Sequence, residues 1–482
     1  MPSRRKKKSH RPLSKKRSIR KKLSTYKKRL NTRLLLEPSE PPGLLIGGKL
    51  ITSFSEPISL HVLKPTKEFI EEQRKYGLYA PILIMFGDLH SSITDDQRCQ
   101  SCTCNQGDIK CCMNVTSKEW LEILNNIRTK DNTTHIDLYT EVAPVFATQE
   151  KEVSDKMFAF KTNKMFHEVV RTAQKCFGRD ASTLAQHSEC PFSNIHFHFS
   201  DPRGQKEYDS RLRKNKEPLK YYLEMIILEF AEGDFSRVIR YSSNDTITDV
   251  EEVFKSIQTE ARKILSLKDL SSKDKIKKIF VDLLFDSPYF GGSKNKSLIY
   301  KQLSKCKGKM GTIEFWREYA NRYFDHYAST YHSTDDWRTK KKIIYDTILQ
   351  DLNNPNKWDQ TSIANRSSMQ TNSSRFVAPF YLDIYMMARS FKQPDSLDEH
   401  KHIFNPYMVL TYQGSYHSQA NSLLLSQTIN GIQLYETPIV EIETMPVLTT
   451  EETFDYNKLN RCIQLDKRVD VDSMIQEVTS VF

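Results

Sequence analysis

The stretch PILIMFGDLH, Pro81 to His90, decides the fold. Five apolar residues, Ile82 to Phe86, run directly into Gly87, Asp88 and His90. An unbroken apolar run bounded by polar residues predicts a strand buried on both faces, which is typical of parallel sheets. In open α/β sheets, ligands bind beyond the carboxyl ends of such strands. We therefore expect Gly87 to let the chain turn, and Asp88 and His90 to be displayed at the sheet edge.

The same arrangement recurs far along the chain. The apolar run YMVLTY, Tyr407 to Tyr412, leads into QGSYH, Gln413 to His417. Each run is followed by Gly-x-x-His, with Gly87 and Gly414 as the expected turn residues. With 15 Gly and 13 His in 482 residues, about 0.4 such motifs are expected by chance, so the motif alone says little. Two copies that each follow a strand signal predict two strand ends carrying a histidine.

Two further predicted strands deliver polar side chains. In HIDLYTE, His135 to Glu141, a period of two places alternate residues on one face, and Glu141 lies at the carboxyl end. In NIHFHFSDPR, Asn194 to Arg203, the two histidines share a face, and Asp201 and Arg203 follow the strand. Each strand has an alternative interpretation. Glu141 could be a solvent-facing acid, and the second strand could be an edge strand with its polar face in water.

Length and composition describe a polar chain with a large core. A length of 482 residues predicts two or three domains. The hydrophobic content is 38% and the mean hydropathy is −0.59. No apolar run approaches 18 residues and the basic start is not followed by an apolar segment, so we expect neither a membrane span nor secretion. The expected location is intracellular.

The positive charge is concentrated at the start of the chain. Residues 1–34 carry 16 Lys and Arg and no acid, while residues 35–482 carry 56 basic and 60 acidic side chains, a net charge of −4. Such a block cannot bury a core, and it predicts a disordered arm that contacts nucleic acid or another polyanion, or serves as a nuclear localisation signal. A solvated tail is the alternative. The candidate nucleic-acid-binding residues are Arg4, Arg5, Lys6, Lys7, Lys8, Lys15, Lys16 and Arg17.

Five of the nine cysteines are clustered. In a reducing compartment, clustered cysteines more often bind metal than form disulfides, and thiolates this close can supply a structural zinc ion. The spacing C-x2-C-x-C-x6-C-C is not that of a standard zinc finger, and free thiols or one local disulfide remain alternatives. The cluster comprises Cys99, Cys102, Cys104, Cys111 and Cys112.

The remaining pattern predicts an α/β fold with a mostly parallel sheet core, a large helical insertion and a disordered basic N-terminal arm. Residues 215–374 read as amphipathic helices, including Ile313 to Ala328, whose aromatic residues, Tyr319 and Tyr323 among them, indicate helix packing. Residues 375–391 predict an apolar helix in which Asp383 and Arg389 would each need a partner. The expected divisions are a basic arm and linker at 1–45, a first core part at 46–214, the insertion at 215–374, a second core part at 375–445 and a peripheral segment at 446–482.

The order of these motifs resembles that of the clan containing TraB, TIKI and erythromycin-esterase-like proteins. The resemblance rests on strand-GDLH, strand-Glu141, the strand before Asp201 and Arg203, and strand-GSYH. It covers roughly residues 80 to 210 and 375 to 430. The helix FYLDIYMMARSF followed by Gly-x-x-His also looks like proteins of large cytoplasmic DNA viruses. The first motif has Asp88 where the clan often has Glu, which leaves the identity of the acid open.

This resemblance implies a divalent metal, zinc or manganese, and hydrolysis in an intracellular viral protein of the host cytoplasm or nucleus, or one packaged in the virion. We expect His90, Glu141 and His417 as ligands, with His198 as a further candidate. Asp88 or Asp201 would be the general base, and Arg203 would hold an anionic group or developing negative charge. The sequence names no substrate.

Two alternatives belong to other classes of protein. One is a non-catalytic virion or nucleic-acid-associated protein that uses the basic arm and retains an enzyme fold as a scaffold. The other is a zinc-dependent interaction module built on Cys99 to Cys112. The hydrolase interpretation requires the GDLH and GSYH segments to converge at one rim of the sheet, and the alternatives do not.

Overall fold

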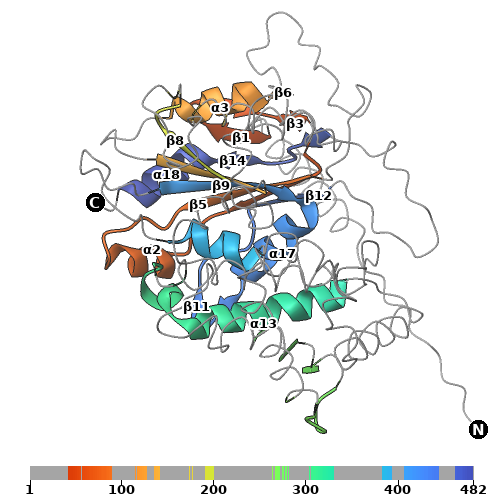
Figure 1. Ribbon diagram of the computed structural model, residues 1–482. Helices are drawn as coiled ribbons and strands as arrows, with labels where there is room; N and C mark the ends of the chain where they lie inside the picture. The colour runs from red at the N-terminus through yellow and green to blue at the C-terminus, as the bar shows by residue number, and fades with distance from the viewer. Residues whose placement is uncertain are drawn as a thin grey trace, which may run out of the picture. The chain divides into compact units, whose positions relative to one another are not determined.

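A computed structural model of the chain shows a layered arrangement of helices and mixed sheets (Figure 1). The chain divides into two units, Met1–Pro42 and Gly43–Phe482, and every named element lies in the second. The structure describes residues 42–55, 57–88, 114–115, 117–127, 135–141, 173, 176, 190, 192–199, 263, 266–271, 274–275, 277–278, 281, 303, 305–330, 383–392, 406–443 and 462–480.

The largest sheet has six strands in the order β12-β4-β5-β9-β7-β8. The last four of these are mutually parallel, and β4 is antiparallel to both of its neighbours. All seven residues of β5 are buried, as the apolar run PILIMF predicts. The prediction of a parallel-rich sheet is confirmed at this level. The strands are β4 (Ser59–Leu63), β5 (Ile82–Asp88), β7 (His135–Thr140), β8 (Ile195–Phe199), β9 (Pro406–Gly414) and β12 (Val440–Glu443).

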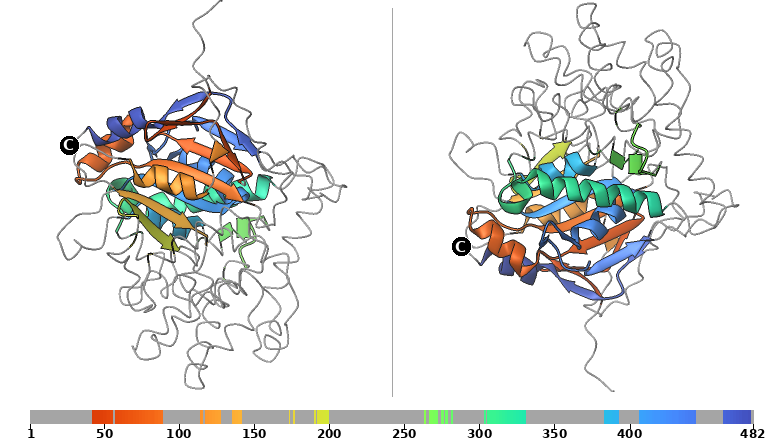
Figure 2. Two further views of the ribbon diagram at one scale, coloured as in Figure 1. Left: turned by 90° about the horizontal axis from the view of Figure 1, so that it is seen from above. Right: turned by 90° about the horizontal axis from the view of Figure 1, so that it is seen from below.

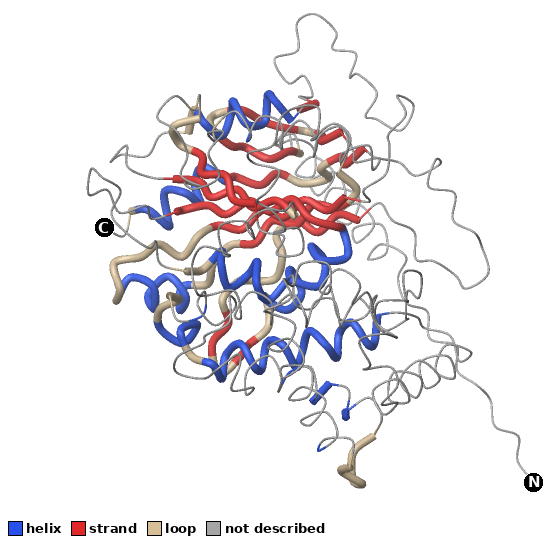
Figure 3. The backbone as a smooth tube through the Cα atoms, in the orientation of Figure 1, coloured by secondary structure: helices blue, strands red, loops and turns tan. Residues whose placement is uncertain are grey.

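Different layers cover the two faces of this sheet. On one face, the ring of Phe86 packs against Trp120 of α3 (Ser117–Asn125) and stacks on Tyr412. On the other face lies α17 (Ser415–Leu425), which contacts β4 and β5, and α13 (Ile313–Thr330) packs on α17. Figure 2 shows α13 crossing the outside of this helical layer, and Figure 3 shows the strands between helices.

Smaller elements complete the described part. Helix α2 begins after Thr66, whose side chain accepts a hydrogen bond from Phe69 N at 3.1 Å, a normal helix start. No described helix is long and apolar enough to cross a membrane. The elements are β1 (Gly43–Ile46), β2 (Lys49–Ile51), β3 (Ser53–Ser55), α2 (Lys67–Arg74), β6 (Asn114–Val115), η4 (Gly308–Gly311), β10 (Thr428–Ile429), β11 (Ile432–Gln433), β13 (Cys462–Gln464), β14 (Arg468–Asp470) and α18 (Val471–Thr479).

The end of the chain belongs to the core, which differs from the peripheral segment we expected. Strand β14 pairs with β1, and β13 pairs with β3. Helix α18 contacts β1, β5 and β9 and buries the side chains Val471, Met474, Ile475 and Val478. The expected linker also contains a strand, because β1 begins at Gly43. The apolar residues of α18 do recur with a helical period in the sequence. We predicted a peripheral segment because acidic residues recur through this part of the chain.

The two motif glycines differ in role. Gly87 does not turn the chain: β5 continues through it to Asp88, and Gly87 pairs with Ser59 on one side and Gln413 on the other. A Cβ at Gly87 would lie 2.0 Å from Ser59 Oγ and 2.5 Å from Ser415 Cα. Its missing side chain therefore admits the first turn of α17. Gly414 does mark a change of direction, as the N-cap between β9 and α17.

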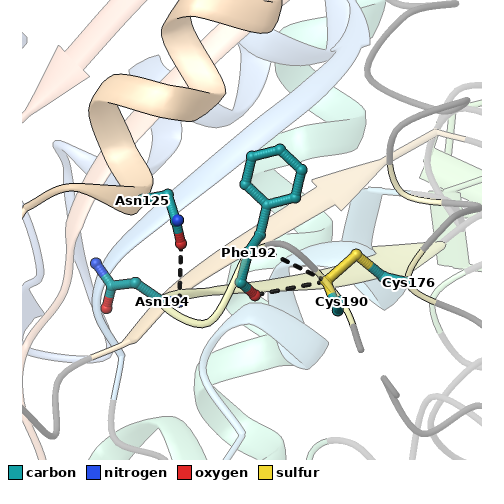
Figure 4. The surroundings of a disulfide bond; sticks show 5 residues. All are labelled: Asn125, Cys176, Cys190, Phe192 and Asn194. Carbon is teal, nitrogen blue, oxygen red and sulfur yellow. Dashed lines mark hydrogen bonds between the residues drawn. A yellow bond between two sulfur atoms is a disulfide. The ribbon is translucent and has the colours of Figure 1, made fainter. Parts of the chain in front are cut away.

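The start of β8 is held by side-chain contacts (Figure 4). Asn194 N donates to Asn125 Oδ1 at 3.1 Å, and Asn194 Nδ2 donates to the carbonyl of Leu124 in the last turn of α3 and to that of Ile127 just after it. Cys176 and Cys190 form a disulfide, and Cys462 is also disulfide-bonded. We expected a reducing compartment, in which cysteines seldom form disulfides, and so we did not predict these bonds.

Candidate functional site

The two Gly-x-x-His strands are neighbours in the sheet. β5 and β9 pair in parallel from Ile82 with Met408 to Asp88 with Gly414, so the two motifs begin side by side at one rim. On the far side of β9 lies β7, which ends at the same rim beside Tyr412. The convergence that the hydrolase interpretation requires is therefore present for these three strand ends. His90 itself lies outside the described residues.

Glu141 follows β7 and is fixed by backbone contacts. Its N–H donates to Tyr412 O at 2.9 Å, and its Oε2 accepts from Gly414 N at 2.8 Å. The side chain is only 5% exposed. A carboxylate held by a backbone N–H at the end of β9 has one orientation, so Glu141 is a preorganised group and not a mobile surface acid.

His417 lies in the first turn of α17, next to Glu141. The distance from His417 Nε2 to Glu141 Oε1 is 3.8 Å, and the distance from His417 Nδ1 to Asp383 Oδ2 is 2.8 Å. The ring is therefore placed between two carboxylates. Since an ionised carboxylate only accepts, Nδ1 carries the proton, and Nε2 presents either a lone pair or a second proton to Glu141.

Asp383 reaches the site from the helical segment 383–390. It is completely buried, and its Oδ2 also accepts a hydrogen bond from the hydroxyl of Tyr323 in α13. Our sequence argument held that Asp383 would need a partner if buried, and these are two such partners. The sequence did not indicate which ones, because they lie 34 and 60 residues away along the chain.

A second polar cluster occupies the same face of the sheet, nearer the start of β7. Asp137 Oδ1 lies 3.5 Å from His196 Nδ1 and 3.2 Å from His198 Nε2, and the ring of Tyr139 stacks on His198. Tyr139 also donates to Arg389 O at 3.1 Å. The structure thus pairs His198 with Asp137 rather than with the Glu141–His417 pair.

Charge and burial act in opposite directions in this second cluster. Burial by itself would raise the pKa of Asp137, but the charges and hydrogen bonds of His198 and His196 hold it well below its ordinary value. Burial lowers the pKa of His198, and Asp137 offsets part of that effect.

The other sequence candidates are either turned away from this site or lie outside the described residues. Asp88 is buried at the end of β5, and the strand period puts it on the face opposite Gly87. The remaining candidates, including the arm residues named above, lie outside the described part: His90, Asp201, Arg203, Cys99, Cys102, Cys104, Cys111 and Cys112.

A small cavity lies at the opposite ends of the strands, beside Pro81 and Pro406. Aromatic side chains, Phe69 and Phe391, line much of it, and Lys392 is its one charged lining residue. Without a described acid or histidine, this cavity offers no hydrolytic group. We therefore locate the candidate site at the carboxyl ends.

The described residues contain no group of three or more His, Cys, Asp or Glu arranged to hold a metal ion. Comparisons with protein-family models, curated proteins and solved structures find no match. The geometry of Asp383, His417 and Glu141 is therefore the basis on which a function can be inferred.

Proposed function

We propose that this protein is a metal-dependent hydrolase whose site is formed by Glu141, His417 and Asp383. The observation that carries the proposal is the row of contacts at one rim of the sheet: Asp383 holds His417 Nδ1 at 2.8 Å, and His417 Nε2 faces Glu141 Oε1 at 3.8 Å. In protein metal sites, a histidine that binds the metal through one ring nitrogen commonly donates the N–H of its other ring nitrogen to a carboxylate.

The described residues fit a divalent ion as two of its ligands. Two ligands of one zinc ion, each about 2.0–2.2 Å away from it, lie no more than about 4.2 Å apart. The 3.8 Å between His417 Nε2 and Glu141 Oε1 is within that limit, and it is too long for a good hydrogen bond. With Nδ1–H given to Asp383, a cation between Nε2 and Glu141 would be favourable to both. We propose His90, at the end of the neighbouring motif, as a third ligand.

The residues of the chain have separate tasks in this proposal. Asp383 selects the ring tautomer of His417 and prevents rotation of the ring. The backbone N–H of Gly414 keeps Glu141 directed at the same point. When bound, zinc or manganese would supply a hydroxide at neutral pH by acidifying a water molecule. Asp201 remains the proposed base and Arg203 the proposed anion-binding group, whereas Asp88 lies on the face of β5 away from α17.

The other parts of the proposal rest on sequence. The resemblance to TraB, TIKI and erythromycin-esterase-like proteins, and to proteins of large DNA viruses, supports hydrolysis in an intracellular viral protein. The parallel rim supports the same α/β arrangement, with residues 215–374 as a helical insertion. Zinc at the Cys99 to Cys112 cluster is proposed on spacing alone.

Metal analysis of the purified full-length protein tests the site. After dialysis into metal-free buffer and reloading with Zn²⁺ or Mn²⁺, wild type should carry one equivalent more than His417→Ala or Glu141→Gln. The matched control is His196→Gln, which removes a histidine from the Asp137 cluster and should keep that equivalent. Equal metal content in all four proteins would overturn the proposal. Activity on chromogenic esters, phosphoesters and peptides should then follow the metal.

We also propose that residues 1–34 contact a polyanion, because 16 basic side chains without an acid favour phosphate binding. Removal of residues 1–40 should therefore abolish DNA or RNA binding. If the protein is a nucleic-acid-binding scaffold rather than a hydrolase, His417→Ala has no functional effect. In a hydrolase, His417→Ala abolishes activity and removal of residues 1–40 does not. Filter binding at two salt concentrations measures the first outcome.

A further inference from the structure

Gln73 places a buried hydrogen-bond donor beside the small cavity at the amino ends of β5 and β9. Its side chain lines that cavity from α2 and is only 3% exposed. Among the described residues, no group accepts a hydrogen bond from its Nε2. A buried amide N–H without an acceptor is unfavourable, and an apolar side chain would pack here at lower cost. The carboxamide therefore points to a ligand that supplies the acceptor.

The position of Gln73 is fixed by the end of its helix. Tyr76 N and Leu78 N both donate to Gln73 O, at 2.9 and 3.1 Å. One turn earlier, Phe69 lines the same cavity and packs edge-on against Phe391, with the ring centroids 6.2 Å apart. A side chain on a fixed helix end, beside packed rings, presents its donor in one place before any ligand arrives.

The other walls of the cavity supply apolar surface. Pro81 precedes β5 and Pro406 begins β9, and a proline has no backbone N–H to donate. Ser390 also lines the cavity, but its hydroxyl donates to Met386 O at 2.8 Å within its own helix. The two strand starts and Ser390 therefore leave the bonding of a ligand to other groups, Gln73 among them.

Charge and size narrow the choice of ligand. Lys392 is the one charged group among the described residues that line the cavity, which favours an anion. The cavity measures about 20 Å³ and is partly open to solvent, so it has room for about one or two water-sized groups. A carboxylate group is of this size, and an aromatic ring is not.

We propose that this cavity binds the carboxylate of a short aliphatic acid. One carboxylate oxygen accepts from Gln73 Nε2, the head group pairs with Lys392, and the aliphatic chain lies at the mouth against apolar lining residues. The cavity lies at the opposite ends of the strands from Glu141 and His417, so the inference does not depend on the proposed function.

The experiment is a titration of the full-length protein with sodium butyrate, followed by NMR of ¹³C-labelled methionine methyl groups. Met310 lines the cavity and Met474 in α18 does not, so butyrate should shift the Met310 signal until saturation and leave the Met474 signal unchanged. Butyramide has nearly the same shape without the charge, and it should bind about fivefold or more weakly. An unchanged Met310 signal, or equal binding of the two compounds, would overturn the proposal.

Substitutions of the two polar lining residues separate their contributions. Gln73→Met removes the carboxamide and keeps an unbranched side chain, and it should weaken butyrate binding about tenfold because a hydrogen bond to a charged acceptor is lost. Lys392→Gln should weaken binding by no more than about fivefold, since Lys392 is half-buried and water screens its charge.

The matched control is Gln433→Met. Gln433 lies in β11, which contacts α2, and its Nε2 already donates to Tyr435 O at 2.9 Å. The same substitution there should keep the wild-type affinity for butyrate. Equal losses in Gln73→Met and Gln433→Met would refute the role given to Gln73.

Stability without any ligand gives a second readout. Because no described group accepts from Gln73 Nε2, Gln73→Met should unfold at the same urea concentration as wild type or a higher one. Butyrate should raise the midpoint for wild type more than for Gln73→Met. A Gln73→Met protein that is less stable than wild type, or does not fold, would show a structural hydrogen bond and contradict the proposal.

Two further compounds test other occupants of the cavity. Inorganic phosphate is an anion without an apolar part, and the blocked amino acid N-acetylglutamate amide represents an acidic side chain of a partner protein. Neither should displace butyrate at equal concentration. Displacement by phosphate would show that the apolar lining does not select the ligand, and tighter binding of the glutamate compound would assign the cavity to a protein partner. Either result would overturn the proposal of a free aliphatic acid.

Discussion

At the scale of single residues, the position of a ring nitrogen decides the chemistry. His417 has one nitrogen committed to Asp383, so the other faces Glu141. In the second cluster two imidazoles share the single carboxylate of Asp137, which offsets part of the effect of burial on the pKa of His198. Similar residue types, in the same layer, therefore give a candidate ligand pair in one case and an acid-sensitive contact in the other.

The Asp137 cluster predicts how stability depends on pH. The pKa of His198 is lower in the folded protein than its ordinary value of about 6.5, so the unfolded chain binds the proton first and stability falls as pH drops below about 6.5. Asp137→Asn removes the group that favours charged His198, which lowers this pKa further. The stability difference between wild type and Asp137→Asn should therefore grow from pH 7.5 to 5.5.

Urea unfolding at several pH values measures this difference. The contribution of Asp137's own depressed pKa is present above about pH 3.9 and disappears only below it, so it does not enter this window. Asp325→Asn is the control, because Asp325 forms a half-exposed ion pair with Lys277 at 3.0 Å. Its stability difference should stay nearly constant from pH 7.5 to 5.5. A constant difference for Asp137→Asn would contradict the prediction.

At the scale of elements, one close contact places α17 on the sheet. Gly87 faces Ser415, the first residue of α17, and Ser418 Oγ donates to Phe86 O at 3.2 Å. The helix that carries His417 is thus docked directly on the strand of the first motif. This explains why a glycine is needed within β5, where the chain runs straight.

Gly87→Ala should both destabilise the protein and weaken the site. The added Cβ would lie 2.5 Å from backbone at Ser415 Cα, which cannot yield without moving α17, so we expect a loss of about 1–3 kcal/mol or more. Urea unfolding and Zn²⁺ titration measure the two effects. Gly48→Ala is the control: it has φ +70° and no atom within 4 Å of its Cβ, and should cost about 1 kcal/mol without changing metal affinity. Equal effects at both positions would refute the docking argument.

Much of this arrangement could be predicted from local sequence. The apolar runs Ile82 to Phe86 and Tyr407 to Tyr412 correspond to β5 and β9, because a strand buried on both faces needs an uninterrupted apolar sequence. Glu141 at the end of β7 could be found from the period of two. The link from Asp383 to Tyr323 could not, since helix periodicity shows which side is buried and not which polar groups meet there.

At the scale of the whole molecule, a disulfide contributes to stability that the apolar pattern of the sequence does not indicate. The Cys176–Cys190 disulfide joins two residues separated by 14 positions just before β8, and β8 is the edge strand of the described six-stranded sheet that carries His196 and His198. A loop of this size is worth about 3 kcal/mol in chain-entropy terms. The bond therefore favours the folded position of this edge strand.

Reduction should lower stability, and the loss should be traceable to this disulfide. Thiol titration of the denatured, unreduced protein should show Cys176 and Cys190 to be protected. The double variant Cys176→Ser/Cys190→Ser should lose up to about 3 kcal/mol in urea unfolding without reductant. With reductant present in both samples, which also breaks the disulfide of Cys462, wild type and the double variant should have nearly the same stability. A double variant as stable as oxidised wild type would show that the bond does not contribute.

The pairing of β1 with β14 has a consequence for how the protein is made. Gly47 N and Gly48 N both donate to Asp472, a residue more than 400 positions later. A growing polypeptide on the ribosome therefore holds β1 and the rest of the sheet without their closing partner until residues 468–472 have emerged. The newly synthesised chain must stay soluble in that incomplete state, and chaperones that bind exposed strand edges have their longest opportunity to act on it then.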